Sequence, residues 1–124
     1  IDVITSNHVP LDPESKDIEF PYASFGAIGL ETAFSVAYEA VAGRVSLKQL
    51  IEKLCFNPRE ILQLPAPGIQ KGVKADLTLF DPQLSWQYTR AGILSRSKNT
   101  WCAGAAFTAG VVGIVREDRV WMQP

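Results

Sequence analysis

The chain opens with IDVITSNHVP at residues 1–10, and this stretch decides the fold class. The apolar run at residues 1–4 predicts a short buried strand that ends in small polar residues. A loop rich in proline and charge follows from His8 to Phe25. Because α/β folds place binding groups in loops that directly follow buried strands, we expect this loop to carry binding groups.

Helical periodicity follows this loop. The apolar residues of the first predicted helix share one stripe, formed by Leu30, Ala33, Phe34, Ala37, Tyr38 and Val41. Gly43 can end that helix in a left-handed conformation. Ser46, with Gln49 three residues later, predicts a capping box for a second helix. Asn57-Pro58 predicts the cap and first turn of a third helix, which ends at residues 62–64.

The hydrophobic period changes to two after Pro65–Gly68, so this segment is the predicted boundary between helical α/β material and a small all-β unit. Strands are predicted at residues 75–81, 85–89, 107–109, 111–116 and 119–122. Glu117-Asp118 fits a hairpin turn, without the glycine that such turns favour. The large aromatic residues are expected in the core rather than on a stacking surface: Trp86, Tyr88, Trp101, Phe107 and Trp121.

Composition favours one globular domain and excludes several function classes. The chain has 124 residues, of which 47% are hydrophobic and 20% are charged. A net charge of −1 gives no electrostatic basis for binding nucleic acid or an anionic membrane. No apolar run approaches the roughly 18–20 residues of a membrane span. Cys55 and Cys102 show neither metal nor redox spacing, so we expect free thiols in a reducing, cytoplasmic setting.

His8 is the only histidine, which limits the chemistry of the chain. A zinc site needs about three or four N, S or O ligands, so His8 alone cannot build one. We therefore expect no metal site and no cofactor held by these residues alone. One strand with three helices would leave unpaired edges and apolar faces, so we expect the chain to be a C-terminal fragment of a longer protein.

Four blocks of the sequence resemble dihydroorotases, the cyclic amidohydrolases of pyrimidine biosynthesis. Residues 1–10 resemble the segment I-D-x-I-A-[ST]-D-H-A-P-H, and FGAIGLETA at residues 25–33 resembles F-G-x-x-G-L-E-T-A. KGVKADLTLFDP at residues 71–82 resembles G-x-x-A-D-L-x-x-x-D-P, which many amidohydrolases share. SRSKNT at residues 95–100 resembles S-K-S-K-N-T. Together the second and fourth blocks favour dihydroorotase over dihydropyrimidinase or allantoinase.

The resemblance implies a fold of class α/β plus β: the C-terminal part of a (β/α)8 amidohydrolase barrel followed by a small β-sandwich. Residues 1–64 would supply the last strand, the active-site loop and the closing helices, and residues 65–124 the C-terminal part of a composite β-sandwich domain. It also implies the family reaction, the reversible, zinc-dependent closure of N-carbamoyl-aspartate to dihydroorotate. The zinc ligands of the family would lie upstream of this chain.

The chain departs from the family pattern at two functional positions. Asn7 stands where the family has the acidic residue that ligates zinc and shuttles a proton, and an amide is no general base near neutral pH. Leu11 stands where the family has a substrate-holding histidine. His8 remains as a substrate-binding candidate, and the resemblance assigns Phe25 and Gly26 to a turn whose main chain contacts the substrate. The resemblance therefore implies a family member with weak or no activity.

Alternatives stay open at several of these residues. His8 fits a loop histidine held by a neighbouring backbone group, and Asn7 fits a strand-end residue that closes an Asx-turn. Gly26 and Gly29 resemble a phosphate-binding loop only weakly. Glu31 fits either a favourable interaction with the helix dipole or a chemical role.

The resemblance also implies partners and two alternative functions. The remainder of the same amidohydrolase chain is the first expected partner, and a homo-oligomer is expected. A non-catalytic homologue would serve as a structural partner of aspartate transcarbamoylase. An active amidohydrolase of changed specificity is the other alternative.

Overall fold

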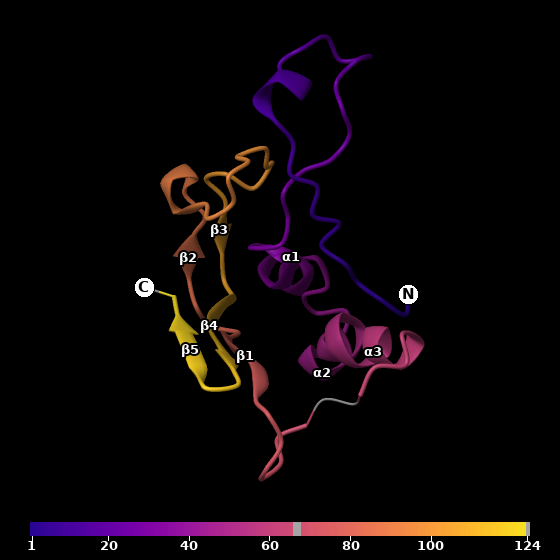
Figure 1. Ribbon diagram of the computed structural model, residues 1–124. Helices are drawn as coiled ribbons and strands as arrows, with labels where there is room; N and C mark the ends of the chain where they lie inside the picture. The colour runs from indigo at the N-terminus through magenta and orange to yellow at the C-terminus, as the bar shows by residue number, and fades with distance from the viewer. Residues whose placement is uncertain (66–67, 124) are drawn as a thin grey trace.

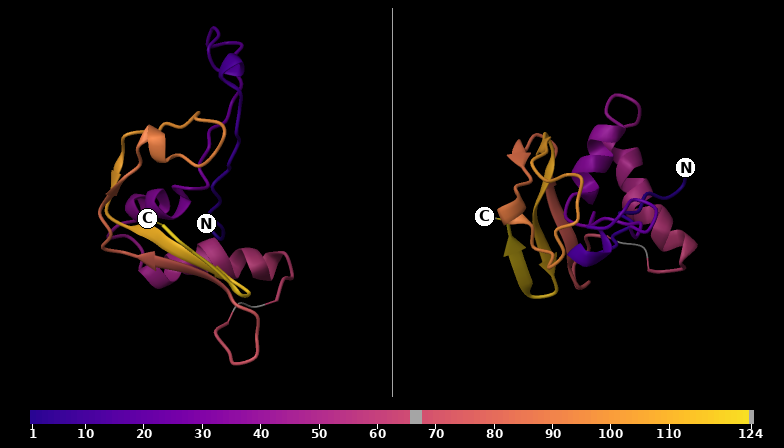
Figure 2. Two further views of the ribbon diagram at one scale, coloured as in Figure 1. Left: turned by 60° about the vertical axis from the view of Figure 1, so that its left-hand side comes forward. Right: turned by 90° about the horizontal axis from the view of Figure 1, so that it is seen from above.

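The computed structural model describes residues 1–65 and 68–123, with the helices on one side of the strands (Figures 1 and 2). The helices are α1 (Ala33–Ala40), α2 (Leu47–Ile51) and α3 (Asn57–Ile61), and the π-helical turn η2 (Glu52–Phe56) joins the last two. The loop between His8 and Phe25 projects away from this body and carries the short 3-10 turn η1 (Pro13–Ser15). The predicted boundary at Pro65–Gly68 lies partly outside the described residues.

The strands form two small antiparallel sheets. β1 (Asp76–Asp81), β4 (Gly110–Arg116) and β5 (Arg119–Met122) pair in the order β1-β4-β5, while β2 (Trp86–Gln87) pairs with β3 (Ala106–Phe107). The strands predicted at 75–81, 111–116 and 119–122 are confirmed. The strand predicted at 85–89 shortens to two residues, and the one predicted at 107–109 forms instead at Ala106–Phe107. The hairpin at Glu117-Asp118 is confirmed, with Glu117 at φ +54° in place of a glycine.

Residues 1–4, which the sequence predicts as a strand, do not form one within the described part of the chain. A strand needs a neighbour for its ladder, and no strand runs beside this segment in the described part of the chain. The segment instead lies along the helical region. Its Ile4 N–H donates to the Lys53 carbonyl at 3.1 Å, and the Asn57 side chain donates to the Asp2 carbonyl at 2.8 Å.

The helices form largely where the periodicity predicts them. The first begins at Ala33 rather than Leu30, whose side chain is exposed. The capping box is confirmed: the Gln49 N–H donates to Ser46 Oγ, and the Ser46 N–H donates to Gln49 Oε1. The cap predicted at Asn57 is wrong, because Asn57 has helical dihedral angles and its N–H donates to the Glu52 carbonyl. The π-helical turn therefore continues α2 into α3 without a break.

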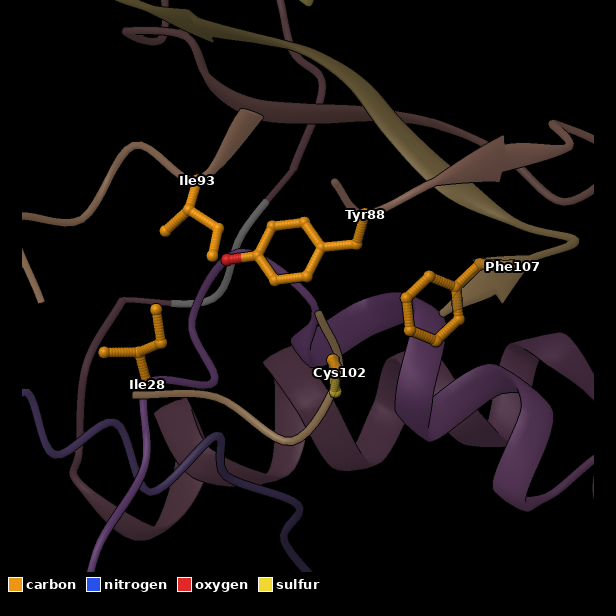
Figure 3. Close-up of a cluster of buried hydrophobic side chains, with 5 residues drawn as sticks. All are labelled: Ile28, Tyr88, Ile93, Cys102 and Phe107. Carbon is orange, nitrogen blue, oxygen red and sulfur yellow. The ribbon is translucent and has the colours of Figure 1, made fainter. Parts of the chain in front are cut away.

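A buried apolar cluster joins the segment before α1 to the strands and loops of the β part (Figure 3). Its members are Ile28, Tyr88, Ile93, Cys102 and Phe107. The rings of Trp86 and Phe107 pack 5.3 Å apart beside it. Trp101 and Trp121 are exposed, so these two side chains do not lie in the core as the sequence predicted. Because Ile28 and Phe107 share the cluster, the two predicted parts of the chain stabilise each other.

Polar side chains of α1 fix the helix to the strand segment 106–110. The buried Ser35 hydroxyl donates to the Ala109 carbonyl at 2.6 Å, and the Glu39 carboxylate accepts the Thr108 N–H at 2.9 Å. The Phe34 ring packs 4.8 Å from that of Phe80 on β1. Within the described residues, no helix has both the length and the apolar character needed to cross a membrane.

Tyr88 gives this core a measurable pH dependence. Burial, followed by the nearby Glu31 carboxylate, raises the pKa of Tyr88 from 10.0 to about 12. Because the folded-state pKa lies above the unfolded value, the stability from neutral Tyr88 is complete below pH 10 and is lost as pH rises through about 12. Alkaline titration of tyrosinate absorbance should resolve this high component, and Tyr88→Phe should remove it. Tyr22→Phe, at an exposed ring, should leave it intact; persistence of the high component in Tyr88→Phe would contradict the assignment.

Candidate functional site

Two segments that carry predicted site residues lie side by side. His8 and Ala27 form a parallel β-bridge, and the Val9 N–H donates to the Ala27 carbonyl at 2.9 Å. This contact brings residues 7–9 next to the turn at Phe25 and Gly26. The structure therefore joins four of the five predicted site positions, and Leu11 follows two residues beyond the bridge.

Two glycines permit this close approach. Gly26 has φ +130°, and a Cβ atom placed there would lie 2.6 Å from Val9 Cγ1. A Cβ atom on Gly29 would lie 2.8 Å from the Ser6 carbonyl oxygen. Glycine is thus required at position 26 by contact with the Val9 side chain and at position 29 by contact with the Ser6 backbone. This packing role accounts for the G-x-x-G spacing without a phosphate-binding loop.

His8 is held by backbone donors at the start of the helical region. Its Nδ1 accepts the N–H groups of Gly29 at 3.3 Å and Leu30 at 3.2 Å. Because Nδ1 accepts, the neutral imidazole carries its proton on Nε2. His8 can therefore donate a hydrogen bond to a ligand from Nε2, while its basic nitrogen is already engaged.

Asn7 lies in the left-handed region, with φ +44°, and its side chain is exposed. Asparagine is among the residues that tolerate this conformation. The expected Asx-turn is absent, because the Val9 N–H that would donate to the Asn7 side chain donates to the Ala27 carbonyl at 2.9 Å. The amide of Asn7 thus stays available to a ligand, as a hydrogen-bond donor and acceptor without charge.

Asn99 holds this region together and was not singled out by the sequence. Its Nδ2 donates to the carbonyls of Gly26 at 3.2 Å and Val9 at 3.4 Å. Its Oδ1 accepts the Leu11 N–H, and its carbonyl accepts the Ile28 N–H. One side chain thus links both bridged segments to the loop before β3. The polar run at residues 95–100 was the only sequence signal for this role.

Leu11 is fixed through its backbone. Ser97 Oγ donates to the Leu11 carbonyl at 2.7 Å, and the Leu11 N–H lies 3.3 Å from the same oxygen. The half-buried Leu11 side chain lines a separate concavity, and an isobutyl group offers a ligand no hydrogen bond. Phe25 is 92% exposed, so its ring packs against little of the described chain.

Glu31 has a structural role that differs from both the helix-dipole interaction and the chemical role considered from the sequence. Its two carboxylate oxygens accept the N–H groups of Leu94 and Ser95, each at 2.9 Å. It also accepts a hydrogen bond from Tyr88, one cause of the raised pKa of that phenol. Glu31 therefore fixes the loop after η3 (Arg90–Gly92) to the start of the helical region.

The site residues do not fit a zinc ion by themselves. Zinc takes about four N, S or O ligands, whereas this corner offers the amide of Asn7 and one ring nitrogen of His8. Across residues 1–65 and 68–123, no group of three or more His, Cys, Asp or Glu side chains is placed to hold a metal ion. The site as described can bind and orient a polar ligand through hydrogen bonds.

Comparison with known proteins bears on this geometry. No protein-family profile matches the sequence. The dihydroorotase of Carboxydothermus hydrogenoformans is 39% identical over 99% of this chain and 29% of its own length. That of Pelotomaculum thermopropionicum is 36% identical over 97% of this chain and 30% of its own length. The chain is homologous to dihydroorotases. It spans about three tenths of the length of these relatives.

Solved structures show the same fold in related enzymes. A D-hydantoinase (dihydropyrimidinase) from Thermus sp. matches 99% of this chain and 28% of its own with a TM-score of 0.82, at 18% identity. An L-hydantoinase from Arthrobacter aurescens matches 85% of this chain and 24% of its own with a TM-score of 0.72, at 26% identity. The dihydroorotase homologue therefore has the fold of a region of the hydantoinase amidohydrolases.

The close contact at Gly26 predicts a position-specific loss of stability. Gly26→Ala combines an unfavourable φ with a clash against Val9, so we expect the free energy of unfolding to fall by about 2–4 kcal/mol. Gly43→Ala is the matched control, because Gly43 has φ +70° but no atom within 4 Å of the added Cβ. It should cost about 1 kcal/mol. Urea unfolding compares the two, and equal losses would contradict the close-contact argument.

Asn99 should be sensitive to both truncation and exchange of its amide. Asn99→Ala leaves the Val9 and Gly26 carbonyls without their donor, and we expect a loss of about 2–3 kcal/mol in the free energy of unfolding. Asn99→Asp should destabilise as much, because a carboxylate oxygen would then face these carbonyls.

Asn57→Ala is the control for Asn99, since it removes one exposed hydrogen bond and should cost less than about 1 kcal/mol. Urea unfolding followed by tryptophan fluorescence gives all three values. A loss at Asn99 no larger than that at Asn57 would show that the Asn99 amide does not hold these segments.

Proposed function

We propose that residues 1–124 are the C-terminal part of a dihydroorotase-like cyclic amidohydrolase. In this proposal residues 1–4 are the last strand of a (β/α)8 barrel, residues 5–64 complete its active-site loop and closing helices, and residues 65–124 belong to a composite β-sandwich. Homology to dihydroorotases over 97–99% of the chain supports it. The unpaired segment at residues 1–4 also supports it, because a barrel neighbour would complete its ladder.

Exposed apolar side chains near the site support the remainder of the same chain as the first partner. Ile1 is 94% exposed and Phe25 is 92% exposed. Large apolar side chains gain free energy when they leave water. A barrel built by the preceding part of the chain would cover both. The loop between His8 and Phe25, which projects from the body of the structure, would then lie at the barrel mouth.

The activity of this protein on the family substrate is weak or absent in our proposal. Closure of N-carbamoyl-aspartate requires a group that moves a proton to and from the reacting nitrogen, and such assistance contributes about 10²–10⁴-fold. Asn7 cannot supply it, because its amide does not accept a proton near neutral pH. His8 cannot replace it, because its Nδ1 already accepts two backbone N–H groups and Nε2 carries the proton. This engagement of His8 is the observation that carries the proposal.

Zinc enters the proposal only through residues outside this chain. Zinc in an active family member would polarise the reacting carbonyl and activate water. Asn7 is a weaker zinc ligand than the carboxylate expected at its position, so the contribution of this chain to a metal site would be reduced. The part of this chain in the reaction would be to orient the substrate, with His8 donating from Nε2 and Asn7 donating or accepting through its amide.

Two other functions suit a chain that keeps the dihydroorotase fold but has Asn7 and Leu11 in place of the family residues. A non-catalytic homologue would act as a structural partner of aspartate transcarbamoylase, within a homo-oligomer. A changed specificity would instead suit a substrate that meets the apolar Leu11 in place of a hydrogen-bonding side chain. Both functions remain proposals, to be distinguished from loss of activity by the same experiment.

The test measures zinc content and cyclisation of N-carbamoyl-aspartate by the full-length protein that contains residues 1–124. We expect little or no dihydroorotate from the natural sequence. Asn7→Asp combined with Leu11→His should raise turnover by about 10²-fold or more, because it restores a proton acceptor and a polar substrate contact. Asn57→Asp makes the same amide-to-acid change away from the site and should have no effect on turnover.

The outcomes separate the three proposals. Dihydroorotate formation at an ordinary rate with Asn7 in place contradicts the loss of activity. A stable complex with aspartate transcarbamoylase, without turnover, supports the structural partner. Turnover of another cyclic amide, with no gain from the double variant on N-carbamoyl-aspartate, supports changed specificity.

A further inference from the structure

A concavity between the projecting loop and the loops around β2 and β3 gathers positive charge. Its volume is about 390 Å³, within the range of small-ligand sites. Lys16, Arg90 and Lys98 line it together with a single carboxylate, that of Asp17. The lining therefore carries an excess of two positive charges, whereas the whole chain has a net charge of −1.

None of the three cations forms an ion pair with a carboxylate within the described residues. The ion pairs among the described residues join other side chains: Lys48 to Glu52, Arg59 to Asp76 and Lys74 to Glu117. Lys98 Nζ donates to the Ile93 carbonyl at 2.7 Å, and Lys16 Nζ donates to the Ser24 carbonyl. Each ammonium has three N–H donors, so two remain on each lysine for a ligand.

Neutral donors complete the lining. Thr100 Oγ1 accepts the Cys102 N–H at 3.1 Å, which leaves the Thr100 hydroxyl proton free to be donated to a ligand. Arg90 adds a planar fork of N–H donors that matches the oxygens of an anion. Three cations and a hydroxyl outnumber the two oxygens of one carboxylate but suit the several oxygens of a phosphoryl group.

The concavity is separate from the candidate amidohydrolase site. Asn7, His8, Phe25 and Gly26 do not line it, and only Leu11 is shared between the two sets of residues. Asn99 reaches both, but its amide is fully engaged in holding Val9, Gly26 and Leu11. A ligand bound here would contact the loop between His8 and Phe25 through Leu11, Lys16 and Asp17.

We propose that this concavity is a binding site for a small phosphorylated molecule, whose phosphoryl oxygens contact Lys16, Arg90 and Lys98 and accept the Thr100 hydroxyl proton. The volume leaves space for an organic group beside the phosphate. Because several charges converge on the ligand, binding should weaken as salt screens them. Because Asp17 opposes an anion, its neutralisation should strengthen binding.

Isothermal titration calorimetry on the full-length protein tests the site with glycerol 3-phosphate, inorganic phosphate and succinate as probes. We expect one phosphate-bearing ligand per chain. Arg90→Gln should weaken its binding by about tenfold, since it removes one of the three positive charges that line the site. Asp17→Asn should strengthen it several-fold. Arg119→Gln, a charge change on β5 outside the lining, should leave it unchanged.

The probes identify the source of the phosphate group. Preference for glycerol 3-phosphate supports an organic phosphate, while equal binding of inorganic phosphate supports the free ion, and both outcomes uphold the site. Succinate binding as tight as that of either phosphate overturns the phosphoryl assignment. An affinity that changes in neither Arg90→Gln nor Asp17→Asn, or the absence of any phosphate binding at low salt, overturns the site itself. Circular dichroism of each variant confirms that the fold is retained.

Discussion

The close parallel contact between residues 6–9 and 26–29 is the constraint on which the site depends. Glycine at positions 26 and 29 lets the two backbones approach, and the bridge from His8 to Ala27 fixes their register. Asn99 then holds both segments from the other side through its amide. The orientation of His8 follows from this arrangement, because its ring nitrogen meets the two N–H groups that the second segment presents.

Local sequence signals predicted the elements whose stabilisation is local. The capping box at Ser46 depends on a residue three positions away. The alternation of apolar and polar residues in β1, β4 and β5 can be recognised within each strand alone. Signals that depend on distant partners failed. Residues 1–4 have the composition of a buried strand but no ladder neighbour among residues 1–65 and 68–123, and Asn57 has the composition of a cap but lies inside a continuous helical run.

The candidate site shows the same difference between features that depend on neighbouring residues and features that depend on distant ones. The position of His8 and Asn7 after an apolar run was readable from the sequence, whereas the role of Asn99 was not, because it contacts carbonyls up to 90 residues away. The family resemblance added the expected chemistry at Asn7 and Leu11, and homology confirms the relationship to dihydroorotases. The hydrogen bonds of His8 required coordinates. They show that Nδ1 of His8 accepts the N–H groups of Gly29 and Leu30.

The cluster of Ile28, Tyr88, Ile93, Cys102 and Phe107 has a consequence for how the chain folds during synthesis. Four members lie between residues 88 and 107, whereas Ile28 precedes them by about sixty to eighty residues. Non-local contacts of this kind slow folding and leave apolar surface open in the meantime. The nascent chain therefore leaves Ile28 without these partners until about sixty further residues have been synthesised, a period in which chaperones would have access to it.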